Sequence, residues 1–139
     1  FEADIFLEPR LVASVMECPH EDVIVVDRFR RPLSGTVVEL AEDGAVRAMH
    51  LKSDQAGLDL GACYKTVNIY RVSAAYAGEF LLPGLDAHIC AGDVNSYYEL
   101  VVKESIREGH VFHGLKTETI RWWEIDTEED LRIAEEMFR

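Results

Sequence analysis

Val23-Ile24-Val25-Val26, followed by Asp27, is the stretch that says most about the fold. Four consecutive apolar, β-branched residues that end at an aspartate are typical of a central strand covered on both faces. Strands of this kind occur in α/β folds, where helices pack on both sides of a sheet. The expected fold class is therefore α/β.

The segments on either side of this strand extend the same pattern. Phe1 to Phe6 reads as the end of a strand, and Pro9 suits the first turn of a helix that runs to about Glu17. Downstream, Gly35 to Leu40 and Ala45 to Lys52 flank Asp43-Gly44, which is a strong hairpin signal between two strand-like segments. One antiparallel hairpin is expected within the sheet.

The rest of the chain predicts three helices and three strands. The strands are expected at Tyr64 to Val72, His110 to Leu115 and Arg121 to Ile125, and the helices are expected to begin at Ser73 (running towards Leu82), at Asn95 and at Thr127. Thr127 is followed by three acidic residues, which favour a helix N-terminus. No internal repeat or linker divides the chain.

Composition excludes several classes of protein. The 139 residues are 48% hydrophobic and 29% charged, as in a globular domain, and no apolar stretch is long enough for membrane insertion. A formal net charge of -12 disfavours binding to nucleic acid. Cys18, Cys63 and Cys90 lie far apart, so neither a disulfide framework nor a zinc site is indicated, and a cytoplasmic location is expected.

Two segments far apart in the sequence carry candidate metal ligands. Asp4 lies at the end of the first strand, within Phe1 to Phe6, while Glu124 and Asp126 close a later strand, and strand alternation puts the latter two on the same face. Open α/β sheets bind ligands at such strand ends, and magnesium prefers oxygen ligands from one or two carboxylates. The alternative is that Asp4 and Asp126 are polar strand ends, or in the case of Asp126 a helix cap.

Several blocks of sequence resemble, in order and spacing, those of the bacterial phosphocholine cytidylyltransferases. They are Glu2-Ala3-Asp4-Ile5-Phe6, Gly35-Thr36-Val37-Val38, Tyr64-Lys65-Thr66-Val67-Asn68-Ile69-Tyr70, Tyr97-Tyr98-Glu99 and Trp123-Glu124-Ile125-Asp126-Thr127, the last followed by Asp130-Leu131. The resemblance covers nearly the whole chain. It implies a Rossmann-like nucleotidyltransferase fold, with a mixed, mostly parallel sheet and an antiparallel hairpin excursion.

The resemblance also implies a reaction and its cofactor. The reaction is the Mg²⁺-dependent transfer of CMP from CTP to a small phospho-alcohol or phosphonate, with release of pyrophosphate. In the family, acids at the positions of Asp4 and Asp126 bind Mg²⁺, which bridges the α-phosphate of CTP and the incoming phosphate, and Glu124 assists. Lys52 falls near a lysine that contacts the acceptor phosphate, with an ordinary solvated lysine as the alternative. Lys65 and Asn68 are candidate substrate contacts, although regular strand alternation puts them on opposite faces, so that only one would touch substrate.

Choline-binding members of the family hold the ammonium with aromatic rings and acids. Tyr97, Tyr98, Glu99 and Trp123 are the candidates here, with packing in the core as the alternative for any single aromatic residue. Arg30-Arg31-Pro32-Leu33-Ser34 departs from the tryptophan that choline-specific relatives carry before the Gly-Thr-Val-Val block. Small phosphonates such as 2-aminoethylphosphonate are therefore expected as acceptors alongside phosphocholine.

The family's glycine-rich, nucleotide-binding loop has no counterpart in these residues. We therefore expect residues 1–139 to be the C-terminal portion of a single nucleotidyltransferase domain whose N-terminal half lies outside the chain, and the fragment alone to be inactive. A homodimer or a fused second enzymatic domain is possible. The alternatives are a non-catalytic regulatory module and a module that binds choline-like cations.

Overall fold

The computed structural model describes all 139 residues, which form seven strands and five α-helices. In chain order the elements are β1 (Ile5–Leu7), α1 (Arg10–Glu17), β2 (Val23–Arg28), β3 (Val37–Leu40), β4 (Val46–His50), β5 (Tyr64–Arg71), α2 (Ala74–Tyr76), α3 (Leu82–Cys90), α4 (Glu99–Arg107), β6 (His113–Lys116), β7 (Trp122–Glu124) and α5 (Glu128–Met137). Short 3-10 turns occupy Lys52–Asp54 and Leu60–Ala62, and a π-helical segment, Ala77–Leu81, joins α2 to α3. None of the helices has the length and apolar character needed to cross a bilayer.

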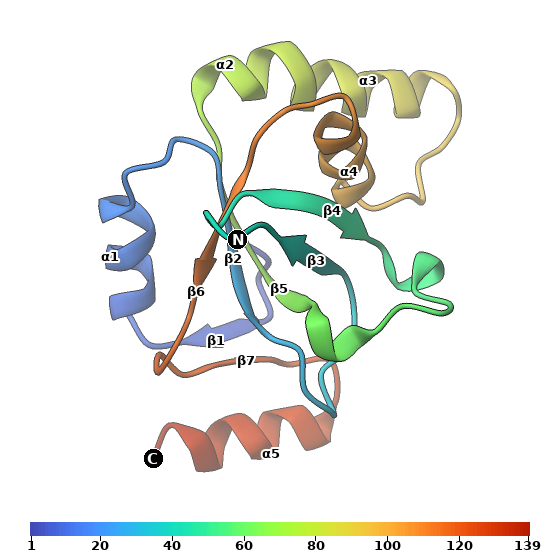
Figure 1. Cartoon of the computed structure of the whole chain (residues 1–139). Helices are drawn as coiled ribbons and strands as arrows, with labels where there is room; N and C mark the ends of the chain where they lie inside the picture. Colours follow the sequence, from blue (N-terminus) through green and yellow to red (C-terminus); the bar gives the residue numbers. More distant parts are fainter.

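Five strands form one mixed sheet in the order β4-β3-β5-β2-β6 (Figure 1). Only β2 and β6 run parallel, because β2–β5, β3–β5 and β3–β4 are antiparallel pairs. The sheet is mixed as expected, and β3 and β4 form the expected hairpin. The expectation that most pairs would be parallel does not hold within this chain, because the hairpin and β5 contribute only antiparallel neighbours.

Strand β2 is buried on both faces, as its four β-branched residues predict. Ile24 and Val26 join a cluster with residues of α2 and α4, whereas Val25 packs with α1 and Trp122 on the other face. Figure 1 shows α1 on the opposite side of the sheet from α3 and α4. The period-two alternation of β2 thus supplies both halves of the core.

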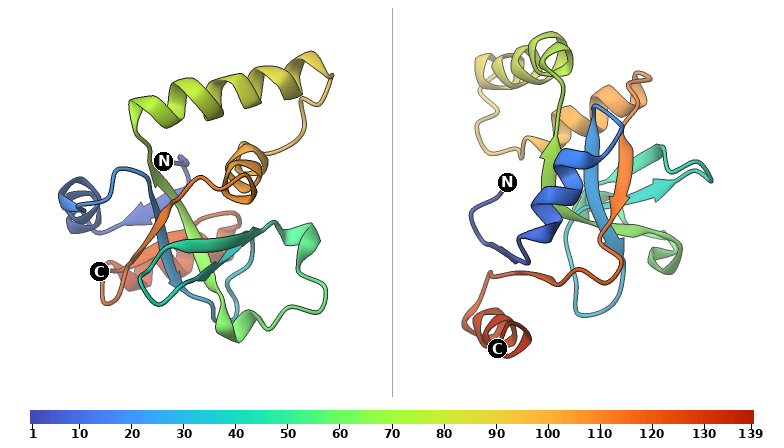
Figure 2. Two further views of the ribbon diagram at one scale, coloured as in Figure 1. Left: turned by 45° about the horizontal axis from the view of Figure 1, so that its top comes forward. Right: turned by 90° about the vertical axis from the view of Figure 1, so that its left-hand side faces the viewer.

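A second, two-stranded sheet joins segments near the two ends of the chain. β1 pairs antiparallel with β7, with Ile5 opposite Glu124 and Leu7 opposite Trp122. Helix α5 runs beside β7 (Figure 2) and begins at Thr127, whose side chain forms a capping box with Asp130 as predicted. Asp4 therefore stands just before a strand and not at the end of one, which corrects the expectation for Phe1 to Phe6.

Helix boundaries differ from the prediction at two places. The helix capped by Ser73 does not stop near Leu82, because the π-helical segment lets it continue to Cys90. Helix α4 is preceded by Tyr98 and not by Asn95, which is exposed in the loop before it. Ser and Asn are common in loops as well as at caps, so the residue type alone did not locate this boundary.

Candidate functional site

A polar hollow of about 390 Å³ brings together residues from six separate parts of the chain. Only one of its twelve lining residues is hydrophobic. The lining residues are Glu2, Asp4, Ser34, Gly35, Thr36, Lys52, Lys65, Asn68, Tyr97, Glu99, Glu124 and Asp126. Nine of the ten predicted site residues lie here or beside it, so the blocks that carry the family resemblance converge in space.

The pairing of β1 with β7 brings Asp4 and Asp126 into this hollow. The backbone N–H of Ile125 donates to the carbonyl of Asp4 over 2.9 Å, directly beyond the Ile5–Glu124 pair. Because the strands are antiparallel, the start of β1 meets the end of β7. The predicted convergence of the two aspartates is thus present, although 122 residues separate them in the sequence.

Lys65 and Glu124 form an ion pair on the wall of the hollow. The Nζ of Lys65 lies 3.3 Å from Oε2 of Glu124 and donates to the carbonyl of Thr66 over 2.6 Å. Lys65 is 1% exposed and Glu124 is half-buried. Burial raises the pKa of Glu124, an effect that the positive charge of Lys65 opposes and that Asp126 and Glu2 reinforce.

Asn68 interrupts the regular alternation of β5. Its φ of 59° is left-handed, and the pairing with β2 shifts register around it, since Ile24 faces Tyr70 while Val26 faces Thr66. This bulge turns Asn68 to the same wall as Lys65. The expectation that the two residues would face opposite sides was wrong, because it assumed a regular strand.

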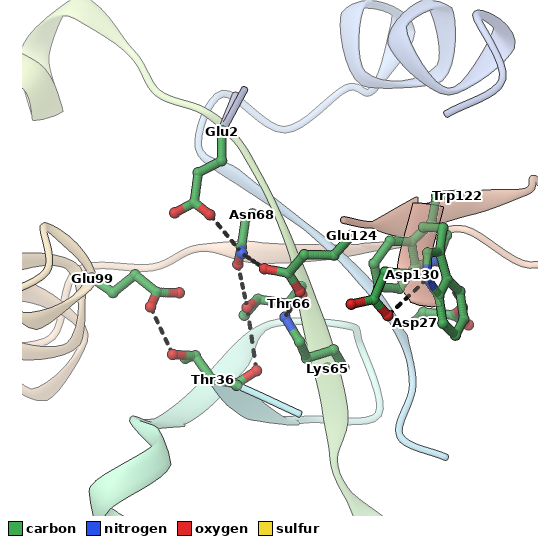
Figure 3. Close-up of polar contacts among 12 residues, drawn as sticks. Glu2, Asp27, Thr36, Lys65, Thr66, Asn68, Glu99, Trp122, Glu124 and Asp130 are labelled. Carbon is green, nitrogen blue, oxygen red and sulfur yellow. Dashed lines mark hydrogen bonds and ion pairs between the residues drawn. The ribbon is translucent and has the colours of Figure 1, made fainter. Parts of the chain in front are cut away.

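The side chain of Asn68 bridges two carboxylates (Figure 3). Its Nδ2 donates to Glu2 and to Glu124, each over 2.8 Å, and its Oδ1 accepts from Thr66 Oγ1 over 3.0 Å. Asn68 is 7% exposed and all of its polar atoms are used. It is therefore a structural element of the hollow.

Glu99 closes the opposite side of the hollow. It is buried at the start of α4 and accepts from Thr36 Oγ1 over 2.7 Å and from Tyr70 Oη over 2.8 Å. Tyr98 packs edge-on against Tyr70 and lines an adjoining apolar pocket that shares Glu2 with the hollow. Burial raises the pKa of Tyr98, and the negative charges of Glu2 and Glu99 raise it further.

Lys52 and Tyr97 are more peripheral, and Trp123 lies outside the hollow. Lys52 is exposed at the rim, and Tyr97, at 75% exposure, covers one edge. Trp123 is buried, and its indole N–H donates to Asp130 over 3.3 Å. Trp123 was predicted either to contact the substrate or to pack in the core, and its burial favours the second alternative.

Four residues of the hollow had no role in the sequence prediction: Ser34, and three that stand in the resembling blocks. Glu2 adds a carboxylate, and Thr36 holds Glu99. Gly35 has a φ of +106°, and a Cβ there would lie 3.0 Å from Cε of Lys65. A glycine directly before a buried strand, as in Gly35-Thr36, was the sequence signal that a neighbouring side chain packs closely against the backbone.

The donor set of the hollow suits Mg²⁺. Oδ1 of Asp4 is buried and has no hydrogen-bond partner, as expected of an atom kept for a cation. Asp126 and Glu124 add carboxylates to the lining of the same hollow. No three His, Cys, Asp or Glu side chains form a complete protein cage, and Mg²⁺ does not require one, because it is held by one or two carboxylates plus substrate phosphates.

Comparison with solved structures identifies the fold as that of nucleotidyltransferases. CTP:phosphocholine cytidylyltransferase (LicC) from Streptococcus pneumoniae matches 99% of this chain with a TM-score of 0.76 and 17% identity. The inositol-1-phosphate CTP transferase from T. maritima matches 96% with a TM-score of 0.60 and 15% identity. The resemblance stated from the sequence is thus confirmed at the level of the fold.

A curated protein of known activity is similar to the chain in sequence. CMP-5'-(3-aminopropyl)phosphonate synthase of Streptomyces rubellomurinus (strain ATCC 31215) is 29% identical over an alignment of 139 residues, which covers 99% of this chain. No protein-family model matches the chain. The chain spans 22% of this relative, and 56% and 51% of the two solved chains.

Proposed function

We propose that these residues form the metal-binding and acceptor-binding part of a cytidylyltransferase. The enzyme would transfer CMP from CTP to a small phosphonate or phosphorylated alcohol in the presence of Mg²⁺. An acceptor oxygen forms a bond to the α-phosphorus, the bond to the β-phosphate oxygen breaks, and pyrophosphate leaves. The observation that carries this proposal is the convergence of Asp4, Asp126 and Lys65 on one hollow in a nucleotidyltransferase fold.

Asp4 and Asp126 would hold the Mg²⁺, with Glu124 assisting. Oδ1 of Asp4 is the buried oxygen without a partner, and the exposed carboxylate of Asp126 stands at the open side of the hollow. When bound, the ion neutralises phosphate charge and stabilises the charge that develops during transfer. The protein contributes the fixed positions of these two side chains.

Lys65 is the residue that we assign to the phosphate or phosphonate of the acceptor. An ammonium has three N–H donors, and here two of them have partners in Thr66 and Glu124. The third is free to donate to an acceptor oxygen in the hollow. Glu124 keeps the buried ammonium charged and oriented, while the exposed Lys52 attracts the anion at the rim.

The far end of the acceptor is proposed to carry a compact ammonium group. Glu2 and Glu99 leave excess negative charge on the side of the hollow next to Tyr98. A primary ammonium donates hydrogen bonds to such carboxylates, whereas a trimethylammonium group needs aromatic faces. Tyr97 is the one aromatic residue that lines the hollow, which favours an aminophosphonate.

The test is a coupled assay of pyrophosphate release by the natural protein that contains these residues. CTP and Mg²⁺ are supplied with 2-aminoethylphosphonate, 3-aminopropylphosphonate, phosphocholine or inositol 1-phosphate. Release that depends on an acceptor and is lost in Asp4→Asn supports the proposal. An absence of release with every acceptor favours the alternative of a non-catalytic module.

The 139 residues alone are proposed to be inactive. Lys52 and Lys65 are the only cations that line the hollow, and two side chains do not hold a triphosphate as a glycine-rich loop does. In the solved relatives the matched region is about half of the chain. Turnover by the purified 139-residue chain at the rate of the natural protein would contradict this part of the proposal.

A further inference from the structure

One polar side chain that lines the hollow, that of Asn68, has all of its polar atoms in hydrogen bonds and contacts both segments that carry the proposed metal ligands. We propose that Asn68 is a positioning residue, which sets the spacing of Asp4 and Asp126 by joining the segments that bear them. This inference rests on the proposed function, because it concerns the same metal site. It assigns no contact between Asn68 and the substrate.

The side chain of Asn68, on strand β5, is hydrogen-bonded to both of these segments. Its Nδ2 holds Glu2, two residues before Asp4, and Glu124, two residues before Asp126. Its backbone carbonyl also accepts from the N–H of Glu2 over 3.3 Å. The segments that bear the two aspartates are thus held by one amide, as Figure 3 shows for Glu2, Asn68 and Glu124.

The bridge matters because the segment before β1 has few other attachments near Asp4. Glu2 is hydrogen-bonded to Asn68 through its backbone and its side chain. The next hydrogen bond of this segment is the one that the backbone N–H of Ile125 donates to the carbonyl of Asp4. Two carboxylates repel each other, and the neutral amide between Glu2 and Glu124 allows them to approach. Loss of the amide would let the Asp4 segment move away from β7, with a weaker metal site as the result.

The left-handed backbone explains why asparagine suits this position. Asn tolerates a φ near 60° better than most residues, and Gly tolerates it at least as well. Asn68→Gly therefore removes the bridge while it preserves the backbone. Glu118 is the only other non-glycine residue with a positive φ, at 54°, and it is exposed outside the hollow, so Glu118→Gly is the matched control.

The experiment measures Mn²⁺ binding by electron paramagnetic resonance in the natural protein, without substrates and without turnover. Asn68→Gly should raise the dissociation constant for Mn²⁺ by about 10-fold or more, as is usual when a group that orients metal ligands is lost. Glu118→Gly should leave it unchanged. Glu2→Ala should weaken binding similarly, and the double variant Glu2→Ala/Asn68→Gly should be no weaker than the worse single variant.

The variants separate the role of Asn68 from the metal site itself. Wild-type affinity in Asn68→Gly, together with weak binding in Asp4→Asn, would overturn the role of Asn68 and leave the metal site in place. If Asp4→Asn and Asp126→Asn also bind Mn²⁺ with wild-type affinity, both the proposed metal site and the proposed role of Asn68 are wrong. Effects of Glu2→Ala and Asn68→Gly that multiply in the double variant would show two independent roles and so contradict the bridge.

Discussion

The ammonium of Lys65 lies 3.3 Å from a carboxylate oxygen of Glu124, although Lys65 is almost wholly buried. A buried charge is costly unless it is paired and hydrogen-bonded, and Lys65 meets both conditions through Glu124 and Thr66. Lys65 also lines the hollow, together with five acidic residues. For this reason the proposed function assigns the anionic end of the acceptor to Lys65.

Lys65→Met should therefore abolish most activity. Methionine keeps the length of the side chain and removes the charge, so we expect kcat/KM to fall by about 100-fold or more, which corresponds to about 2.7 kcal/mol. Lys116→Met is the control, because Lys116 is exposed on β6 beyond the hollow. Near-normal kcat/KM in Lys65→Met would remove Lys65 from the site.

Gly35→Ala should disturb the same lysine from the other side. An alanine there would adopt a strained left-handed backbone, at a cost of about 1–2 kcal/mol, and its Cβ would lie 3.0 Å from Cε of Lys65. Gly57→Ala carries the same backbone strain with no atom within 4 Å. Chemical denaturation and kcat/KM should thus show a loss of stability in both variants, larger in Gly35→Ala, and a loss of activity in Gly35→Ala alone.

Acceptor preference tests the charge distribution of the hollow. We expect a higher specificity constant for 2-aminoethylphosphonate than for phosphocholine, because Glu2 and Glu99 suit a hydrogen-bonding ammonium and Pro32 stands where an aromatic wall is expected. Steady-state kinetics with both acceptors measure the ratio. A preference for phosphocholine by about tenfold, or about 1.4 kcal/mol, would contradict the assignment.

Alkaline pH should destabilise the fold through Tyr70. Burial, followed by the negative charge of Glu99, raises the pKa of Tyr70 well above its ordinary value of 10.0. The folded chain therefore keeps a proton that the unfolded chain releases above about pH 10, and stability falls there by at most about 1.4 kcal/mol per pH unit for this group. Denaturation at pH 9 and pH 11 should show a smaller loss in Tyr70→Phe; an equal loss would exclude this origin.

Much of the fold follows from local sequence patterns. The β-branched run of β2, the Asp43-Gly44 turn and the Thr127 cap each specify an element through nearby residues, and each is present as predicted. The strand order and the parallel or antiparallel sense depend on long-range contacts that these patterns do not encode. For that reason the expectation of a mostly parallel sheet did not hold within the chain.

The site residues were predictable where residue type and family resemblance agreed. They were less predictable where the direction of a side chain depends on an irregular backbone conformation. Asp4 and Asp126 were found as acids in resembling blocks, and the β1–β7 pairing brings them together. The shared wall of Lys65 and Asn68 was missed, because a single left-handed residue reverses the alternation of β5. An asparagine within a β-branched strand was the available signal for such a bulge.

Asp4 and Asp126 are proposed to share one magnesium ion. The anomalous scattering of Mn²⁺ in crystals of the natural protein grown with CTP locates such an ion directly. We expect one ion in the hollow, in contact with the carboxylate of Asp4 and with Asp126 directly or through one water molecule, and we expect its loss in Asp4→Asn. An ion bound elsewhere, or one that persists in both Asp4→Asn and Asp126→Asn, would exclude a shared magnesium site.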